Sequence, residues 1–104
     1  MSTRVFFFNR LGDGADPAEY ERWVREVDYP KARSIPSIRS YEVVRIDGPL
    51  RDSGIDYDYV EVVEVTDLDD YRDDLSSLPG REQFVAELRA FIPSADAAVG
   101  TLIE

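Results

Sequence analysis

The chain has 104 residues, and 43% of them are hydrophobic, which suffices for one ordinary core and is too much for a disordered chain. Its net charge of −10 argues against nucleic-acid binding, which needs a basic stripe, and against an anionic membrane surface. The absence of Cys and His excludes disulfides, thiol nucleophiles, zinc fingers, haem-type His ligands and Ser-His-Asp triads. Any acid–base chemistry must therefore fall to Asp, Glu, Tyr, Lys or Arg.

The first apolar run covers four residues and stops at Asn9, which is too short for a signal sequence or a membrane span. We therefore expect a cytoplasmic protein. The chain contains no internal repeats or linkers, and residues 1–104 are predicted to form a single domain.

Residues 4–9, a compact run of Val and Phe ahead of a Gly-rich turn, predict a buried strand. A helix should begin with Asp16 as N-cap, Pro17 at N1 and Glu19 at the third position of a capping box. One apolar face of that helix follows from the helical spacing of four residues: Tyr20, Trp23, Val24 and Val27.

Pro30 is predicted to interrupt this first helix and to push Tyr29 toward an extended conformation. The rest of the chain alternates between strands and helices. We expect a strand at 38–46, a loop at 47–54, a strand at 57–65, a short helix after Asp67, a longer helix from Arg81 to Pro93, and a strand at 97–103.

This order is two split β-α-β units, typical of an α+β, ferredoxin-like βαββαβ fold with a four-stranded antiparallel sheet and its helices on one face. The other face of the sheet also carries aromatic residues and valines. A monomer of this size would leave that face in water, so we expect a homodimer in which two sheets pack face to face.

Three stretches, Glu26–Tyr41, Tyr57–Leu68 and Tyr71–Phe91, together resemble the RedY-like (HapK-type) proteins, small members of the dimeric α/β barrel superfamily. The resemblance covers nearly the whole chain. It implies a homodimeric barrel encoded among natural-product genes, in pathways to prodigiosin-type pyrroles and indole-derived dimers. It also implies a small aromatic ligand, with ring closure or condensation steered without a cofactor.

Glu61 is the first candidate catalytic residue, because it lies among valines on a central strand where burial would favour general acid–base work. The period of two places Tyr59, and also Tyr57, on the same face, so Tyr59 is predicted to orient the substrate or relay a proton. The alternative is that Glu61 pairs with an Arg across strands or lies at the dimer rim.

Asp28 is a further catalytic candidate, and Arg33 a substrate-binding one, because they bracket Pro30 and could line a pocket mouth. The alternative for this pair is a local ion pair that fixes the turn. Arg39 and Tyr41 share a face of the second strand and offer a cation and a ring to a planar ligand. The alternative for Arg39 is protection of an edge strand.

Trp23 and Asn9 complete the predicted substrate-binding set. Trp23 belongs to the apolar face of the first helix, and it could be core or the wall of a ligand cleft. Asn9 follows three Phe residues, so if buried it must be hydrogen-bonded by backbone or ligand; alternatively it serves the next turn.

No metal or other cofactor is expected. The acidic run at 67–74 lacks the Gly turn and spaced ligands of a calcium loop and fits a solvated helix face. Three functions remain open: a cofactor-independent enzyme or cyclisation-steering protein acting on an aromatic intermediate, a non-catalytic small-molecule carrier, and a cofactor-free monooxygenase-like activity.

Overall fold

The computed structural model describes residues 2–104, which form one four-stranded sheet with strand order β2-β3-β1-β4. The strands are β1 (Thr3–Arg10), β2 (Ile38–Arg45), β3 (Tyr59–Val65) and β4 (Ser94–Thr101). All three pairings are antiparallel. The predicted ferredoxin-like α+β fold is thereby confirmed, and β3 and β1 are its central strands.

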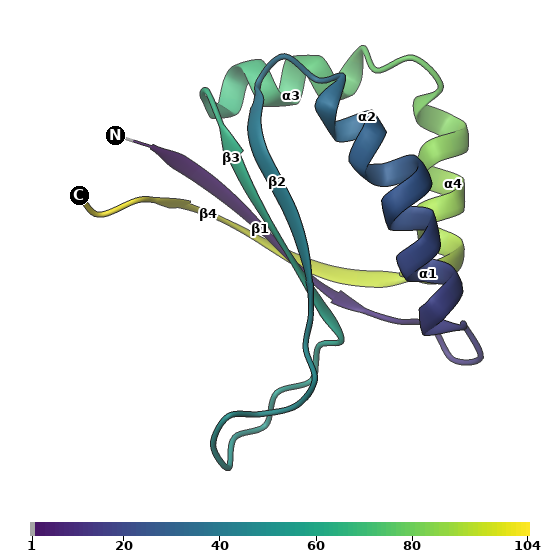
Figure 1. The fold of residues 1–104 in the computed structure, drawn as a ribbon. Coiled ribbons are helices and arrows are strands. Elements are labelled where there is room, and N and C mark those ends of the chain that lie inside the picture. The colour runs from purple at the N-terminus through teal and green to yellow at the C-terminus, as the bar shows by residue number, and fades with distance from the viewer. Residues whose placement is uncertain (1) are drawn as a thin grey trace.

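All helices lie on one side of this sheet (Figure 1). The first crossing consists of α1 (Pro17–Trp23), the π-helical segment η1 (Val24–Asp28) and α2 (Tyr29–Arg33), which run on without a break. The second crossing consists of α3 (Leu68–Ser76) and α4 (Arg81–Phe91). As predicted, Asp16 caps α1 and Asp67 caps α3, each accepting a backbone N–H within the first turn.

The prediction that Pro30 interrupts the first helix is wrong, as is the extended conformation expected for Tyr29. Tyr29 is helical, with φ −60° and ψ −47°, and its N–H donates to the carbonyl of Val24 five residues earlier. The π-helical turn begins a new register, so Pro30 falls in the first turn of α2, where no backbone donor is required. The same turn brings Asp28 into the protein interior.

The helix-facing side of β3 alternates strictly, with Tyr59, Glu61, Val63 and Val65 all buried. Tyr57 does not continue this row, contrary to the prediction. It precedes β3, its ring lies 5.4 Å from that of Phe8, and the Arg10 guanidinium lies 4.4 Å from its centroid. Phe8 and Arg10 are on the helix-free side, because β1 places Asn9 on the other, so the chain turns over before β3 starts.

Two apolar clusters join the helices to the sheet. The first surrounds Tyr20, Trp23 and Tyr59, and it contains all four residues of the predicted apolar face of the first helix. The second surrounds Val63 and Tyr71 under α3. The helix-free side of the sheet carries Phe6, Phe8, Val60 and Val62, which face one another in register across β1 and β3 and stay partly exposed.

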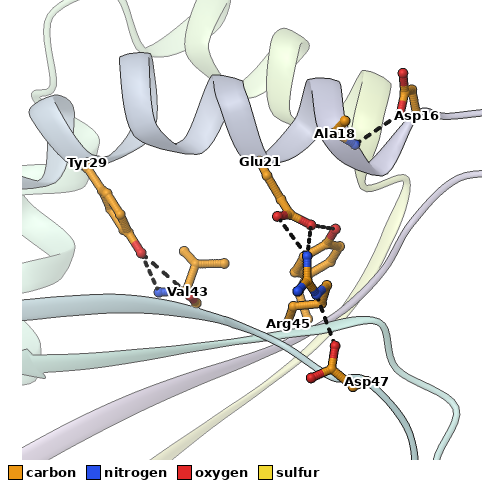
Figure 2. Close-up of polar contacts among 8 residues, drawn as sticks. Asp16, Ala18, Glu21, Tyr29, Val43, Arg45 and Asp47 are labelled. Carbon is orange, nitrogen blue, oxygen red and sulfur yellow. Dashed lines mark hydrogen bonds and ion pairs between the residues drawn. The ribbon is translucent and has the colours of Figure 1, made fainter.

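Polar contacts attach α1 to the edge of the sheet next to the first cluster (Figure 2). Glu21 accepts hydrogen bonds from Arg45, at 3.1 and 3.2 Å, and from the Tyr59 hydroxyl, at 2.8 Å. The Tyr29 hydroxyl accepts the backbone N–H of Val43 on β2 at 3.2 Å. These contacts close the α1 end of the helix–sheet interface.

Candidate active site

A cavity of about 490 Å³ opens between the helices and the sheet at the other end of this interface. Its volume is within the range of small-molecule sites. The cavity exists because α4 presents a long apolar stripe that the sheet does not fully cover: no residue of α4 is buried. Phe84, Val85 and Leu88 of that stripe form one wall, and Phe7 and Ile38 of the sheet face the same space.

Four polar side chains form a connected chain at the floor of the cavity. The Tyr41 hydroxyl lies 2.6 Å from Oδ2 of Asp28 and also hydrogen-bonds Oε1 of Glu61. The other carboxylate oxygen of Glu61 accepts a hydrogen bond of 2.7 Å from Nδ2 of Asn9. Asp28 is 5% exposed, Glu61 7% and Asn9 1%, and Asp28, Glu61, Asn9 and Tyr41 all line the cavity.

Strand register determines this grouping. Glu61 on β3 stands opposite Phe7 on β1 and Val43 on β2, so Asn9 and Tyr41 are its diagonal neighbours on the same face. Diagonal pairs in antiparallel strands lie within reach of long side chains. Asp28 completes the chain from above, because η1 positions it over the Tyr41 hydroxyl.

The single hydroxyl proton of Tyr41 limits how Asp28 and Glu61 can both hydrogen-bond to it. The Tyr41 hydroxyl has a single proton and bonds two carboxyl groups, so it donates to one of them and accepts from the other. Glu61 also receives the Asn9 amide, which stabilises its charged form. Within residues 2–104 no second side-chain donor reaches Asp28, so the count of donors favours Asp28 as the acid that keeps a proton and Glu61 as the one that is ionised.

Burial acts on the pKa values of all three ionisable groups of this hydrogen-bond chain. Burial raises the pKa of Asp28 to about 7, the Tyr41 hydrogen bond opposes that rise, and the Glu61 charge adds to it. Burial also raises the pKa of Glu61, while hydrogen bonds from Tyr41 and Asn9 hold it down. Burial raises the Tyr41 pKa well above its ordinary value, so the phenol keeps its proton. No Lys or Arg within residues 2–104 forms an ion pair with either acid.

The structure brings together half of the residues proposed from the sequence: Asn9, Asp28, Tyr41 and Glu61. It does not bring Tyr59 to them, because the Tyr59 hydroxyl donates to Glu21 at the closed end of the interface. Tyr41, expected to contact the substrate, occupies the position beside Glu61 that was expected for Tyr59.

The other three proposed residues also lie outside the cavity lining. Trp23 packs against Tyr20, Phe84 and Phe91, and its indole N–H donates to Glu87 at 2.8 Å. Arg33 and Arg39 are exposed and lie in a separate depression beside β2, next to the outer part of Tyr41.

Sequence reasoning missed several residues of the cavity. Tyr71 of α3 reaches it, and burial raises the Tyr71 pKa to about 12. Lys31, Arg81 and Arg89 also line it. The spacing did contain a signal for α4, since Arg81 and Arg89 fall on the same helical stripe as Phe84, Val85 and Leu88.

Within residues 2–104 no group of three or more acidic side chains is arranged to hold a metal ion. The acidic run of α3 lies mostly on the solvent side of that helix, as its solvated-face interpretation requires. In the same part of the chain, no helix combines the length and the apolar character needed to cross a membrane.

Comparison with known protein families gives one match, to the family described as REDY-like protein HapK, over residues 3–103. No curated protein sequence is significantly similar to the chain.

Several solved structures share the fold. HapK from Hahella chejuensis is 24% identical with a TM-score of 0.79, over 97% of this chain and 92% of that one. SnoaB, a cofactor-independent oxygenase from Streptomyces nogalater, is 25% identical with a TM-score of 0.70, over 99% and 93%. A dimeric ferredoxin-like protein from Thermobifida fusca is 20% identical with a TM-score of 0.73, over 98% and 92%.

Proposed function

The chain belongs to the REDY-like HapK family, and from that premise we propose a cofactor-independent enzyme that acts on an aromatic, pyrrole- or indole-type natural-product intermediate. The observation that carries the proposal is the chain Asp28–Tyr41–Glu61–Asn9 at the floor of an apolar cavity. Acids whose pKa values are raised by burial, and which face a cavity without a cation beside them, are suited to general acid–base work.

In this proposal Glu61 is the base. Its carboxylate takes a proton from an N–H, O–H or activated C–H of the bound ring system, and the electron pair stays on the substrate. The resulting carbon or nitrogen nucleophile adds to a carbonyl carbon of the bound intermediate, and the C=O π electron pair moves to the oxygen, which takes up the proton from Glu61. In a condensation this new hydroxyl then leaves as water together with a neighbouring proton of the adduct. Glu61 is thereby a carboxylate again, and the step consumes neither oxidant nor reductant.

Asp28 and Tyr41 maintain the charge balance of that step. In this proposal Asp28 is protonated, so the cavity floor carries one negative charge and not two. Asp28 donates a hydrogen bond to the Tyr41 hydroxyl, and that hydroxyl donates one to Glu61. When Glu61 has taken up a proton, the Tyr41 hydroxyl can turn and donate to Asp28. The hydrogen-bond chain of these four side chains therefore accommodates both the charged and the neutral form of Glu61. Asn9 fixes the second oxygen of Glu61 and so orients the carboxylate.

The test is incubation of the purified protein with synthetic pyrrole- and indole-type intermediates, with and without oxygen, followed by mass spectrometry. A product that forms equally in both atmospheres, at unchanged mass or with loss of water, supports the proposal. Tight binding of an intermediate that the wild-type protein returns unchanged would instead establish a carrier.

A second candidate is a cofactor-free oxygenase. It is supported by the 25% identity to SnoaB, a cofactor-independent oxygenase, over nearly the whole chain. The same base would deprotonate a phenol or enol to give an electron-rich anion that reacts with dioxygen directly. This candidate predicts a product that gains oxygen and requires air, so the incubation described above separates it from redox-neutral ring closure.

We also propose that two copies pair through the helix-free face of the sheet. Phe6, Phe8, Val60 and Val62 form an apolar patch there, and a dimeric fold relative supports the pairing. Removing such a patch from water is a common reason for homodimers. Light scattering at low micromolar concentration should give the dimer mass, and Phe6→Asp should give the monomer. A wild-type monomer would contradict the pairing.

A further inference from the structure

We propose that Lys31 and Arg81 bind a carboxylate of the ligand at the mouth of the cavity, so that the substrate is an aromatic acid whose rings extend toward Glu61. This inference rests on the proposed function, because it specifies the substrate class of the same cavity. It concerns the mouth of the cavity, and none of the residues in the proton chain takes part.

The distribution of charge in the cavity supports an anionic ligand. Twenty-two of the 104 residues are acidic and twelve are basic. The cavity reverses this balance, because its charged lining residues are three cations, Lys31, Arg81 and Arg89, and the two acids of the floor. Lys31 is moreover the sole lysine of the sequence. A concave site with an excess of one sign of charge favours ligands of the opposite sign.

Position separates the cations from the acids. Asp28 and Glu61 are buried, whereas Arg81 is exposed and Lys31 partly so, which places the two cations at the solvent end. The Lys31 amine also lies close to the backbone that leads into Arg81. The Lys31 amine donates to the carbonyl of Pro79 at 3.2 Å and lies 3.9 Å from the point where a Cβ on Gly80 would stand. Gly80 directly precedes Arg81.

The Arg81 guanidinium is available to a ligand, because no ion pair or side-chain hydrogen bond engages it within residues 2–104. A planar guanidinium and an ammonium that line the same cavity suit a carboxylate. Arg89 follows Arg81 by eight residues, about 12 Å along the helix, so it lies at the other end of the stripe and is left out of the proposed carboxylate site.

These positions also fix the direction in which the ligand enters. Ionised Glu61 repels a carboxylate from the floor, and the cations attract it at the mouth. The apolar stripe of α4, which lines the same cavity, accommodates the rings. The charged end of the substrate therefore stays near solvent while the reacting part reaches the base.

Two fluorescent probes with the same ring system test this inference. 8-Anilinonaphthalene-1-sulfonate carries an anion, and N-phenyl-1-naphthylamine lacks it. Their dissociation constants would be measured by fluorescence titration for the wild type and for Lys31→Gln/Arg81→Gln. The control is Arg51→Gln/Arg72→Gln, which changes the net charge equally at exposed positions outside the cavity lining. Circular dichroism would confirm that each variant is folded.

We expect the sulfonate to bind the wild type more tightly than the neutral probe. Lys31→Gln/Arg81→Gln should weaken the sulfonate about three- to thirtyfold, the range for two partly exposed ion pairs, and leave the neutral probe unchanged. An equal effect from the control pair would show that overall charge is responsible and would overturn the inference.

A third variant, Leu88→Trp, fills the cavity and should weaken both probes. If both bind equally well after this change, the probes lie elsewhere and the inference fails. If the neutral probe binds in the cavity as tightly as the sulfonate, the inference fails while the aromatic cavity, and with it the proposed function, remains. Loss of turnover in Glu61 variants tests that function separately.

Discussion

Two clusters of tyrosine and carboxylate lie on the same side of the sheet and differ in what surrounds them. At the closed end under α1, Glu21 bonds Tyr59 and also Arg45, which is 60% exposed (Figure 2). At the cavity end, Glu61 bonds Tyr41, with Asp28 and Asn9 beside it and no cation. The first cluster lowers the pKa of Glu21, chiefly through the Tyr59 hydrogen bond, and the second raises those of Glu61 and Asp28.

The comparison shows that a tyrosine paired with a carboxylate has a different role in each of the two clusters. A cation and solvent stabilise the charge of Glu21, so this acid holds α1 on the edge of the sheet and has no tendency to take a proton. Burial without a cation raises the pKa of Glu61 and brings the pKa of Asp28 to about 7, so Asp28 is poised to exchange a proton near neutral pH. Each prediction below tests one consequence of that difference.

The largest expected effect is on turnover. Glu61→Gln keeps the shape and most hydrogen bonding but removes the base, so turnover of an established substrate should fall about 10²–10⁴-fold. Stability should barely change. Glu21→Gln, the matched change at the closed end, should leave turnover intact. Steady-state kinetics of both variants measure the change in turnover relative to the wild type. Undiminished turnover in Glu61→Gln would show that Glu61 is not the base.

The two ends should also differ in packing. Trp23→Ala removes a ring that contacts Tyr20, Phe84 and Phe91 at the closed end, and should cost about 3–5 kcal/mol of unfolding free energy. Leu88→Ala enlarges a wall that already faces open space, so it should cost less than about 2 kcal/mol, below the range for filled cores. Urea denaturation measures both, and similar losses would contradict the difference in packing.

The pH dependence of stability should come from the cavity end. The Asp28 pKa is about 7 in the folded protein and about 4 in the unfolded chain. Between these values the folded state holds the extra proton, so stability falls as pH rises. The loss from pH 5 to pH 8 should reach about 3 kcal/mol.

Asp28→Asn should flatten this dependence, because the side chain then stays neutral in both states. Asp52→Asn, the same change in an exposed loop, is the control for net charge. Urea unfolding at several pH values provides the comparison. Equal slopes for the wild type and Asp28→Asn would show that Asp28 ionises normally in the folded protein.

The smallest effect is expected from Tyr59→Phe. It removes one hydrogen bond of 2.8 Å to a partly exposed carboxylate, for a cost of about 0.5–1.5 kcal/mol. It should also raise the pKa of Glu21, since that hydrogen bond is the main cause of its lowering. NMR titration would follow the Glu21 carboxyl carbon. A large fall in turnover in Tyr59→Phe would show that Tyr59 takes part in the mechanism.

Much of the fold was predictable from local patterns. The alternation of β3 identified its buried face, Asp16 and Asp67 marked two helix starts, and the order of elements indicated the ferredoxin-like topology. Pro30 was misread because a local rule places proline outside a helix interior. The shift to π-helical hydrogen bonding places Pro30 in a new first turn, so the helix continues without needing a backbone donor there. The spacing of apolar residues in the sequence does not predict this shift.

The sequence by itself determined that Glu61 would be a buried acid on a central strand, because alternation assigns faces independently of partners. Tertiary structure alone decided which tyrosine meets it. Tyr59 is two residues from Glu61 on one strand, about 6.6 Å away along it, and leans toward α1. Tyr41 approaches through strand register, and Asp28 through the π-helical turn. Both depend on contacts between segments far apart in the sequence, which no local pattern encodes.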